Sequence, residues 1–289
     1  MANSSPPAPF QLKGRTLDFS VPRIMGVINA TPDSFFGASR VAQAKQAAAT
    51  AVRMVEDGAD ILDIGGQSSR PGAEAVGAHA ECDRVLPVIE EIRSVLPDHP
   101  ISVDTYHAHV ALKALETGAD IVNDIGAALL DPHMEDLVAE RNVPYILMHM
   151  QGTPDTMQNA PTYTRVVEEV AAFLTERLLA LRSKGAQQLG VDPGFGFGKS
   201  VDHNYQLLDG LGQLGSLGVP ILAGVSRKSM IYKVLDSSPE RALNGTSVLH
   251  AWALDRGAHI LRVHDVAEAA ECVKLHRAMK MSRLHSTND

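Results

Sequence analysis

Cysteine is scarce in this chain of 289 residues, and aromatic residues make up only 4% of it. The two cysteines, Cys82 and Cys272, lie far apart within helical patterns, and we interpret them as thiols of a reduced protein rather than as a disulfide. No stretch approaches the roughly 18 consecutive apolar residues that a membrane span needs. The first ten residues lack the basic and apolar regions of a signal peptide. A cytoplasmic location is therefore expected.

An excess of basic charge is also lacking, because the formal net charge is −8. Nucleic-acid binding needs a basic face, so nucleic acid is excluded as a general partner. The hydrophobic fraction of 45% is ordinary and supplies a core. The composition therefore indicates a globular protein that binds neither nucleic acid nor a membrane.

What the chain does contain is a regular alternation of short apolar runs and amphipathic stretches. The apolar runs cover residues 24–28, 61–64, 101–103, 121–122, 145–148, 189–191, 221–223 and 260–263. Helical patterns cover residues 42–56, 80–95, 110–116 and 166–181. Strands of this length between helices predict a parallel sheet. Eight strands favour a closed (β/α)8 TIM barrel, with a doubly wound α/β sheet as the alternative.

A repeated motif supports this count of strands. The segments DGADILDIGG, TGADIVNDIG and RGAHILRVHD begin at Asp57, Thr117 and Arg256. Each has a glycine suited to a helix C-cap, then an alanine, an apolar strand and polar residues. No linker or low-complexity segment divides the chain after the first residues. We therefore expect one barrel domain over residues 19–289, preceded by a flexible tail over residues 1–18.

Polar residues close the expected strands or follow them directly. They are Asn29, Ser69, Arg70, Asp104, Asn123, Asp124, His149, Asp192, Arg227, Lys228, Arg262 and His264. Any one of them alone is more typical of a helix cap or a satisfied core residue. In a TIM barrel, however, the strand ends meet at one face, which is where active sites form. Their convergence there favours a functional site.

Two kinds of chemistry are present among these residues. Asp104, Asn123 and Asp192 offer acceptors for adjacent N–H donors, such as those of an aminopyrimidinone ring. In contrast, Arg262 with His264 suits a phosphate or diphosphate, and Asn29 is a possible oxygen ligand for Mg²⁺. A further basic point, Arg227 with Lys228 at a helix entry, suits a carboxylate or another anion. The set predicts a flat nitrogen heterocycle beside an anionic leaving group.

The segment VDPGFGFGKS, residues 191–200, ends in Gly-Lys-Ser like a phosphate-binding P-loop. The P-loop pattern needs a glycine where this chain has Pro193, which has a fixed φ and no N–H to donate. The segment alone therefore leaves open whether Lys199 contacts a phosphate.

Eight motifs in the same order resemble those of the dihydropteroate synthase family, from about residue 20 to residue 275. They are MGVINATPDSF (25–35), DIGGQSSRPGAE (63–74), ISVDT (101–105), VNDI (122–125), LMHMQGTP (147–154), DPGFGFGK (192–199), GVSRKSMI (224–231) and RVHD (262–265). The resemblance implies a homodimeric (β/α)8 transferase of folate synthesis and a sulfonamide target. Such enzymes use Mg²⁺ and join 6-hydroxymethyl-7,8-dihydropterin diphosphate to 4-aminobenzoate, releasing diphosphate.

The resemblance also implies roles for individual residues. The pterin would be held by Asp104, Asn123, Asp192 and Lys228. Diphosphate and Mg²⁺ would be served by Asn29, Arg262 and His264, and the aminobenzoate pocket would be lined by Ser69, Arg70, Phe197 and Ser229. Lys199 is then not expected to contact phosphate. The implied mechanism is SN1-like, with Asp104, Lys228, Arg262 and His264 as the catalytic residues.

The chain departs from the family pattern at a few positions. Residues 36–39 read Phe-Gly-Ala-Ser where the family has Ser-Asp-Gly-Gly. Gln67 and Ser69 replace the usual Glu and Thr, and Tyr106 with His107 follows the third motif where smaller or other polar residues are common. Two alternatives share a pterin pocket. A methyltransferase that acts from methyltetrahydrofolate on a corrinoid protein would need neither the Ser-Ser-Arg-Pro loop nor the Arg-Val-His ending. A pterin-binding protein without catalysis could arise from the altered first loop, but the presence of Asn29, Arg70 and His264 argues against it.

Overall fold

Eight parallel strands form the centre of the computed structural model, which describes residues 6–30, 37–67, 76–153, 156–157 and 160–285. The strands are β3 (Arg23–Asn29), β4 (Ile61–Gly65), β5 (Ile101–Asp104), β6 (Ile121–Asp124), β7 (Tyr145–Met148), β8 (Leu189–Asp192), β9 (Leu222–Ala223) and β10 (Ile260–Val263). Their order is β8-β7-β6-β5-β4-β3-β10-β9, and a bridge between Val191 and Ile221 joins β8 to β9. The predicted (β/α)8 barrel is confirmed.

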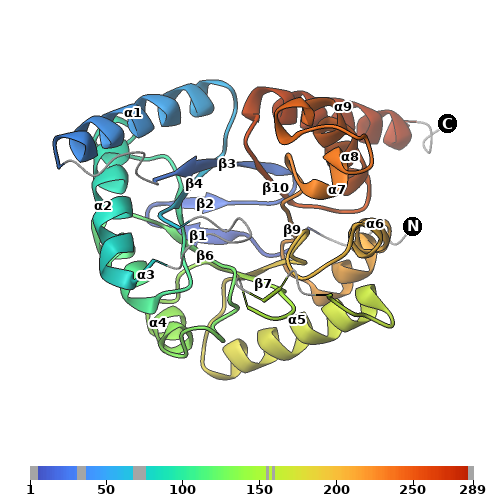
Figure 1. Ribbon diagram of the computed structural model, residues 1–289, viewed down its shortest axis with the longest axis horizontal. Coiled ribbons are helices and arrows are strands. Elements are labelled where there is room, and N and C mark those ends of the chain that lie inside the picture. The colour runs from blue at the N-terminus through green and yellow to red at the C-terminus, as the bar shows by residue number, and fades with distance from the viewer. Residues whose placement is uncertain (1–5, 31–36, 68–75, 154–155, 158–159, 286–289) are drawn as a thin grey trace.

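Helices surround the strands on the outside, as Figure 1 shows. They are α1 (Gly37–Glu56), α2 (Ala78–Val95), α3 (Ala108–Thr117), α4 (His133–Arg141), α5 (Val166–Ser183), α6 (Val201–Asp209), α7 (Ser229–Tyr232), α8 (Leu243–Asp255) and α9 (Val266–His285). The four predicted helical patterns fall within α1, α2, α3 and α5. Within the described ranges, no helix combines the length and apolar character that crossing a lipid bilayer requires.

The two faces of each strand pack differently because side chains alternate along a strand. In β4, Leu62 and Ile64 point outward and join the large core between strands and helices. The inner position Ile61 belongs instead to a second core inside the barrel, together with Met25 and Ile260. All three lie in the first half of their strands, so the amino-terminal end of the barrel is closed by apolar side chains.

The N-terminal segment differs from the expected flexible tail. Strands β1 (Phe10–Leu12) and β2 (Arg15–Leu17) form an antiparallel hairpin, and Figure 1 shows it across the middle of the barrel. Phe10 is 1% exposed and packs edge-on against Phe19, with ring centroids 5.0 Å apart. Both rings belong to the inner core, and burying a phenylalanine contributes about 1.5–3 kcal/mol. The hairpin is ordered because it closes the barrel's amino-terminal end.

Candidate active site

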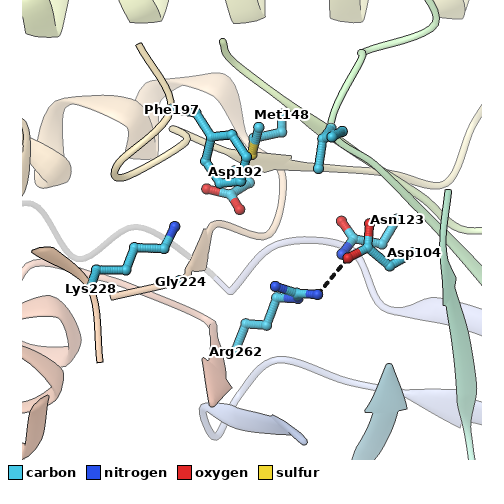
Figure 2. A pocket seen from close by; sticks show the side chains of 9 residues that line it. Asp104, Asn123, Met148, Asp192, Phe197, Gly224, Lys228 and Arg262 are labelled. Carbon is cyan, nitrogen blue, oxygen red and sulfur yellow. Dashed lines mark hydrogen bonds and ion pairs between the residues drawn. The ribbon is translucent and has the colours of Figure 1, made fainter. Parts of the chain in front are cut away.

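A polar pocket lies at the opposite, carboxyl-terminal end of the strands (Figure 2). Its lining residues are Asp104, Asn123, Ile125, Met148, Asp192, Phe197, Gly224, Lys228 and Arg262. They come from six of the eight strands or the loops that directly follow them. Five of the residues predicted from the strand ends, the three carboxylate or amide residues with Lys228 and Arg262, are therefore brought together as expected.

One buried residue of this site was missed by the sequence analysis. Asp63 is completely buried, and its Oδ2 accepts hydrogen bonds from Arg262 Nε at 2.6 Å and Asn123 Nδ2 at 3.2 Å. Asp63 lies inside β4, whereas the residues predicted for the site end or follow a strand. The signal was the alternation in ILDIG, which places Asp63 on the same inner face as Ile61.

Arg262 connects two carboxylates across the barrel. Its Nη2 donates to Asp104 Oδ2 at 2.6 Å, the contact drawn in Figure 2, while its Nε binds Asp63. Burial raises the pKa of Asp104 to about 7, against the opposing effect of the Arg262 charge. Since a single guanidinium faces both carboxylates, the pocket retains strong acceptor capacity for a ligand that presents N–H groups.

Asp192 and Lys228 form the other side of the pocket. Asp192 Oδ1 accepts from the Gly194 N–H at 2.7 Å, and burial raises the pKa of Asp192 although Lys228 lowers it. The Lys228 ammonium donates to the Phe195 carbonyl and lies 4.6 Å from the centre of the Phe197 ring. Burial lowers the pKa of Lys228 to about 8, with Asp192 acting in the opposite direction. Figure 2 shows the Lys228 side chain extending toward Asp192 and Phe197.

His264 and Asn29 lie at neighbouring strand ends but do not line the pocket. Ser226 Oγ accepts from the His264 backbone N–H at 3.2 Å and contacts His264 Nδ1 at 3.0 Å. Loss of hydration, followed by repulsion from Arg262, lowers the pKa of His264, so the ring is neutral at pH 7. Asn29 is exposed at the end of β3. Nowhere in the described part of the chain do three or more His, Cys, Asp or Glu side chains gather as a metal site.

Arg227 does not provide the anion-binding point that the sequence suggested. Its Nε and Nη2 donate to both carboxylate oxygens of Asp265, at 2.8 and 2.7 Å. Its Nη1 donates to the carbonyls of Pro239 and Glu240, both at 3.0 Å. These bonds occupy the guanidinium, which holds together the segments around β9 and β10. The side chain of Lys228, the next residue in the chain, points in a different direction and lines the pocket.

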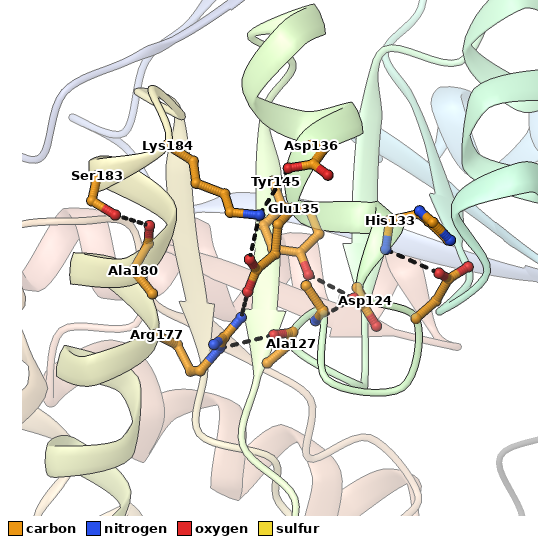
Figure 3. A network of polar contacts seen from close by, with 12 residues as sticks. Asp124, Ala127, His133, Glu135, Asp136, Tyr145, Arg177, Ala180, Ser183 and Lys184 are labelled. Atoms are coloured by element: carbon orange, nitrogen blue, oxygen red, sulfur yellow. Dashed lines mark hydrogen bonds and ion pairs between the residues drawn. The ribbon is translucent and has the colours of Figure 1, made fainter.

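Asp124 does not line the pocket but belongs to a separate polar network, which Figure 3 shows. It accepts from the N–H groups of Gly126 and Ala128 and from the Tyr145 hydroxyl, at 2.6, 2.8 and 2.6 Å. Arg177 Nε donates to the carbonyl of Ala127 in the same turn at 3.1 Å. Ala127 and Ala128 both have positive φ, of 49° and 59°, which alanine adopts only when its surroundings impose it. This network therefore fixes the turn that carries Ile125 into the pocket.

The remaining predicted residues have mixed outcomes. Phe197 is buried with Met148 and Met157, and Ser229 is the half-buried first residue of α7. Ser69 and Arg70 lie outside the described residues, as does Phe36 of the unusual first loop. Two further departures from the family pattern contact each other, because Gln67 Nε2 donates to the Tyr106 hydroxyl at 3.0 Å. Lys199 is outside the pocket and 4% exposed.

Comparison with known proteins agrees with this geometry. The family described as pterin binding enzyme matches residues 25–264. Dihydropteroate synthase from Haemophilus influenzae is 44% identical over 91% of this chain and 96% of its own length. The Escherichia coli dihydropteroate synthase is 42% identical, over 91% of this chain and 93% of the relative.

Solved structures give the same result. Xanthomonas albilineans dihydropteroate synthase with 4-aminobenzoic acid superposes with a TM-score of 0.87 at 43% identity, covering 96% of this chain and 99% of that structure. The Yersinia pestis enzyme in a sulfonamide drug complex gives 0.88 at 39% identity, covering 95% and 100%. Nearly the whole length is matched in both chains. This chain therefore belongs to the dihydropteroate synthase family of pterin-binding enzymes.

Proposed function

We propose that Asp104, Asn123 and Asp192 bind the pterin ring in the reaction that this protein catalyses. The protein is a transferase of folate biosynthesis, which condenses 6-hydroxymethyl-7,8-dihydropterin diphosphate with 4-aminobenzoate to 7,8-dihydropteroate and diphosphate. The observation that supports the proposal is the gathering of carboxylates and an amide around one guanidinium in a buried pocket. A pterin presents adjacent N–H groups on its pyrimidinone edge, and carboxylate acceptors give the strongest hydrogen bonds to them.

Lys228 completes the pterin site in this proposal. Its ammonium lies on the same side as Asp192 and above the Phe197 ring, where it can donate to a ring acceptor such as the pterin carbonyl oxygen or a ring nitrogen. Its lowered pKa, about 8, still leaves it mainly protonated at pH 7. Lys228 would therefore fix the orientation of the ring relative to the carboxylates.

We assign the diphosphate to the region around Arg262 in β10, His264 directly after that strand and Asn29 at the end of the neighbouring β3. If the Ser226 hydroxyl donates to His264 Nδ1, the neutral ring keeps its Nε2–H free to donate to a phosphate oxygen. Mg²⁺ binds through one or two protein oxygens, waters and substrate phosphates. The Asn29 amide oxygen fits that donor set, and magnesium would neutralise charge on the departing diphosphate.

The proposed mechanism is an SN1-like substitution. The C–O bond to diphosphate breaks first and its electron pair leaves with the diphosphate, so a cation forms on the pterin methylene carbon. Asp104 faces the positive charge, and Arg262 with His264 faces the negative charge. Fixed charges of this kind, aimed at charges that develop in the transition state, are usually the largest catalytic term. The amine nitrogen of 4-aminobenzoate then attacks the carbon and loses a proton.

The aminobenzoate would lie against Phe197 and Ser229, together with Ser69 and Arg70 of the second loop. The Xanthomonas and Yersinia relatives bind 4-aminobenzoic acid and a sulfonamide drug, respectively. We propose that the same subsite of this chain accepts both. Competition between a sulfonamide and 4-aminobenzoate in steady-state kinetics tests this assignment.

Diphosphate release by the purified protein tests the whole proposal. Release is expected only when the pterin diphosphate, 4-aminobenzoate and Mg²⁺ are all present, and Asp104→Asn should reduce it by about 100-fold, as removal of one charge-stabilising group does. Pterin binding without release would support the non-catalytic alternative. Methyl transfer from methyltetrahydrofolate to a corrinoid protein would support the other.

We further propose a cytoplasmic homodimer that associates through α8 and α9. Both cysteines are free thiols, as a reducing compartment predicts. Among the residues that the structure describes, seven of the twelve exposed large apolar side chains lie in the last quarter of the chain, five of them on α8 or α9, which pack on each other. They are Val234, Leu235, Val248, Trp252, Leu275, Met279 and Met281. A self-complementary apolar face suits a two-fold dimer. Trp252→Glu should give monomers in analytical ultracentrifugation, whereas Leu179→Glu, an exposed leucine on α5, should leave dimers.

A further inference from the structure

Lys199, the lysine of the P-loop-like segment, is buried behind the pocket wall. Its Nζ donates to the carbonyls of Gly194 at 2.9 Å and Phe197 at 3.0 Å, and it contacts His149 Nδ1 at 2.9 Å. Burial lowers the pKa of Lys199 to about 7, and in the protonated form its three N–H bonds are all used by these three contacts. Lys199 therefore has no donor left for a ligand.

His149 is the partner that anchors Lys199 to the barrel. It follows β7, is 6% exposed, and packs edge-on against Phe173 with ring centroids 4.9 Å apart. Burial, and after it the Lys199 charge, lower the pKa of His149 to about 3, so the ring is neutral and its Nδ1 can accept. The contact thus connects the end of β7 to the loop after β8.

The backbone of that loop lies unusually close to the neighbouring loop after β7. Gly194 and Gly198 have positive φ, of 73° and 60°, and a Cβ on either would overlap with the carbonyl of His149 or Gln151, respectively. Tyr163 Oη also donates to the Gly198 carbonyl, at 2.8 Å. The loop is therefore pressed against the end of β7, with Lys199 in the space between them.

The two carbonyls that Lys199 binds belong to the turn that bears Phe197. The Gly194 carbonyl also accepts from the Phe197 N–H at 3.1 Å, so one short turn carries both acceptors and the ring. Asp192 also accepts from the Gly194 N–H of this turn, but its backbone belongs to β8 and pairs with Met148 in the sheet. A change at Lys199 should therefore move Phe197 more than Asp192.

We infer that Lys199 and His149 form a positioning pair that sets the Phe197 ring, and so controls aminobenzoate binding more than pterin binding. The inference rests on the proposed role of Phe197 in the aminobenzoate subsite. Neither residue contacts substrate in this role. Each acts by fixing the turn between the two substrates.

The test compares Michaelis constants for the two substrates in Lys199→Met and His149 variants. Losing this anchor is worth about 1 kcal/mol, so Lys199→Met should raise the KM for 4-aminobenzoate about fivefold, with less than about a twofold change for the pterin diphosphate. His149→Phe should have the same effect because it removes the acceptor. His149→Asn should restore nearly normal values, since the amide oxygen can replace Nδ1 as an acceptor.

Arg93→Met provides the matched control for lost stability. Arg93 is also a cation that donates to backbone carbonyls, those of Pro97, His99 and Gly118, but near the amino-terminal ends of β5 and β6. Its replacement should lower the melting temperature and leave both Michaelis constants unchanged. Phe197→Ala separates the two proposals: if it leaves the KM for aminobenzoate unchanged, the proposed role of Phe197 fails. If Phe197→Ala does raise the KM for aminobenzoate, two results would overturn the positioning pair. In one, Lys199→Met and His149→Phe fold normally and leave that KM unchanged. In the other, these two variants raise the KM values for aminobenzoate and for the pterin diphosphate equally.

Discussion

Arg262 Nε donates a hydrogen bond to Asp63 Oδ2 over 2.6 Å, although 199 positions separate the two residues in the chain. The contact joins β10 to β4 across the inside of the barrel. Because Arg262 also binds Asp104, two carboxylates fix the plane of its guanidinium. Arg262, which we assign to the diphosphate, is thus hydrogen-bonded directly to Asp104, which we assign to the pterin.

Asp63→Asn should weaken both the fold and the site. The substitution keeps the side-chain size but removes the buried charge that pairs with Arg262, and breaking a buried pair costs about 3–5 kcal/mol. Freed from one partner, Arg262 should also lose its fixed orientation, so kcat/KM should fall. Urea denaturation and steady-state kinetics measure the two effects.

Asp120→Asn, which breaks the 2.9 Å contact with Arg93 near the start of β6, should reduce stability without changing kcat/KM. Equal kinetic losses in the two variants would contradict this account.

Replacing Arg262 should affect pterin binding as well as diphosphate binding. The sequence alone places Arg262 with the diphosphate, and that assignment by itself would predict that the Arg262→Ala variant binds a bare pterin almost normally. The structure changes that expectation, because the variant leaves Asp63 and Asp104 without their cation and, for Asp104, removes the charge that opposes protonation. We expect bare pterin to bind at least about tenfold more weakly, equivalent to about 1.4 kcal/mol, in isothermal titration calorimetry. His264→Ala should change that affinity less than about twofold.

Much of the barrel was readable from the sequence because strand and helix periodicities are local properties. The eight apolar runs and the residues that follow them, such as Asp104 and Asp192, were placed correctly for this reason. The direction of a side chain past the end of a strand is not local. Arg227 and Lys228 are adjacent in sequence, yet one binds Asp265 and the other lines the pocket. Their side chains take different directions because of how the loops pack in the folded protein.

Two features were missed although the chain carries a signal for each. Phe10, Leu12, Leu17 and Phe19 alternate with other residues on either side of Gly14, which has a φ of 77°. This is a weak hairpin pattern, and strands of three residues gain their stability from covering the barrel end rather than from propensity. Asp63 breaks an apolar strand at an inward position. A buried carboxylate inside a strand is a stronger indication of a site than a polar residue after it.

Pterin binding should depend on pH through Asp104. Burial raises the pKa of this carboxyl to about 7, so it is largely protonated at pH 6 and largely ionised at pH 8. If the ionised form accepts hydrogen bonds from the pterin, affinity for bare pterin should increase as the pH rises through 7. Asp104→Asn cannot ionise and should bind pterin more weakly, without the increase through pH 7; partial deprotonation of Lys228, with a pKa of about 8, should only reduce its affinity slightly by pH 8. Calorimetric titrations at the two pH values check both expectations, and a pH-independent wild-type affinity would exclude Asp104 as the titrating acceptor.

Glu81 should make the free energy of unfolding depend on pH. This residue of α2 is 1% exposed, and burial raises its pKa from 4.5 to about 7, with the nearby Thr105 side chain acting in the opposite direction. The folded protein therefore holds a proton that the unfolded chain releases between pH 4.5 and 7. Its contribution to stability is fully present below pH 4.5 and is lost as the pH rises through 7, a change on the order of 3 kcal/mol.

Glu81→Gln lacks this ionisation, so its stability relative to wild type should improve from pH 5 to pH 8 in urea denaturation. Glu90→Gln, an exposed site on the same helix, should show no such trend, and parallel curves for wild type and Glu81→Gln would mean that Glu81 does not ionise in this range.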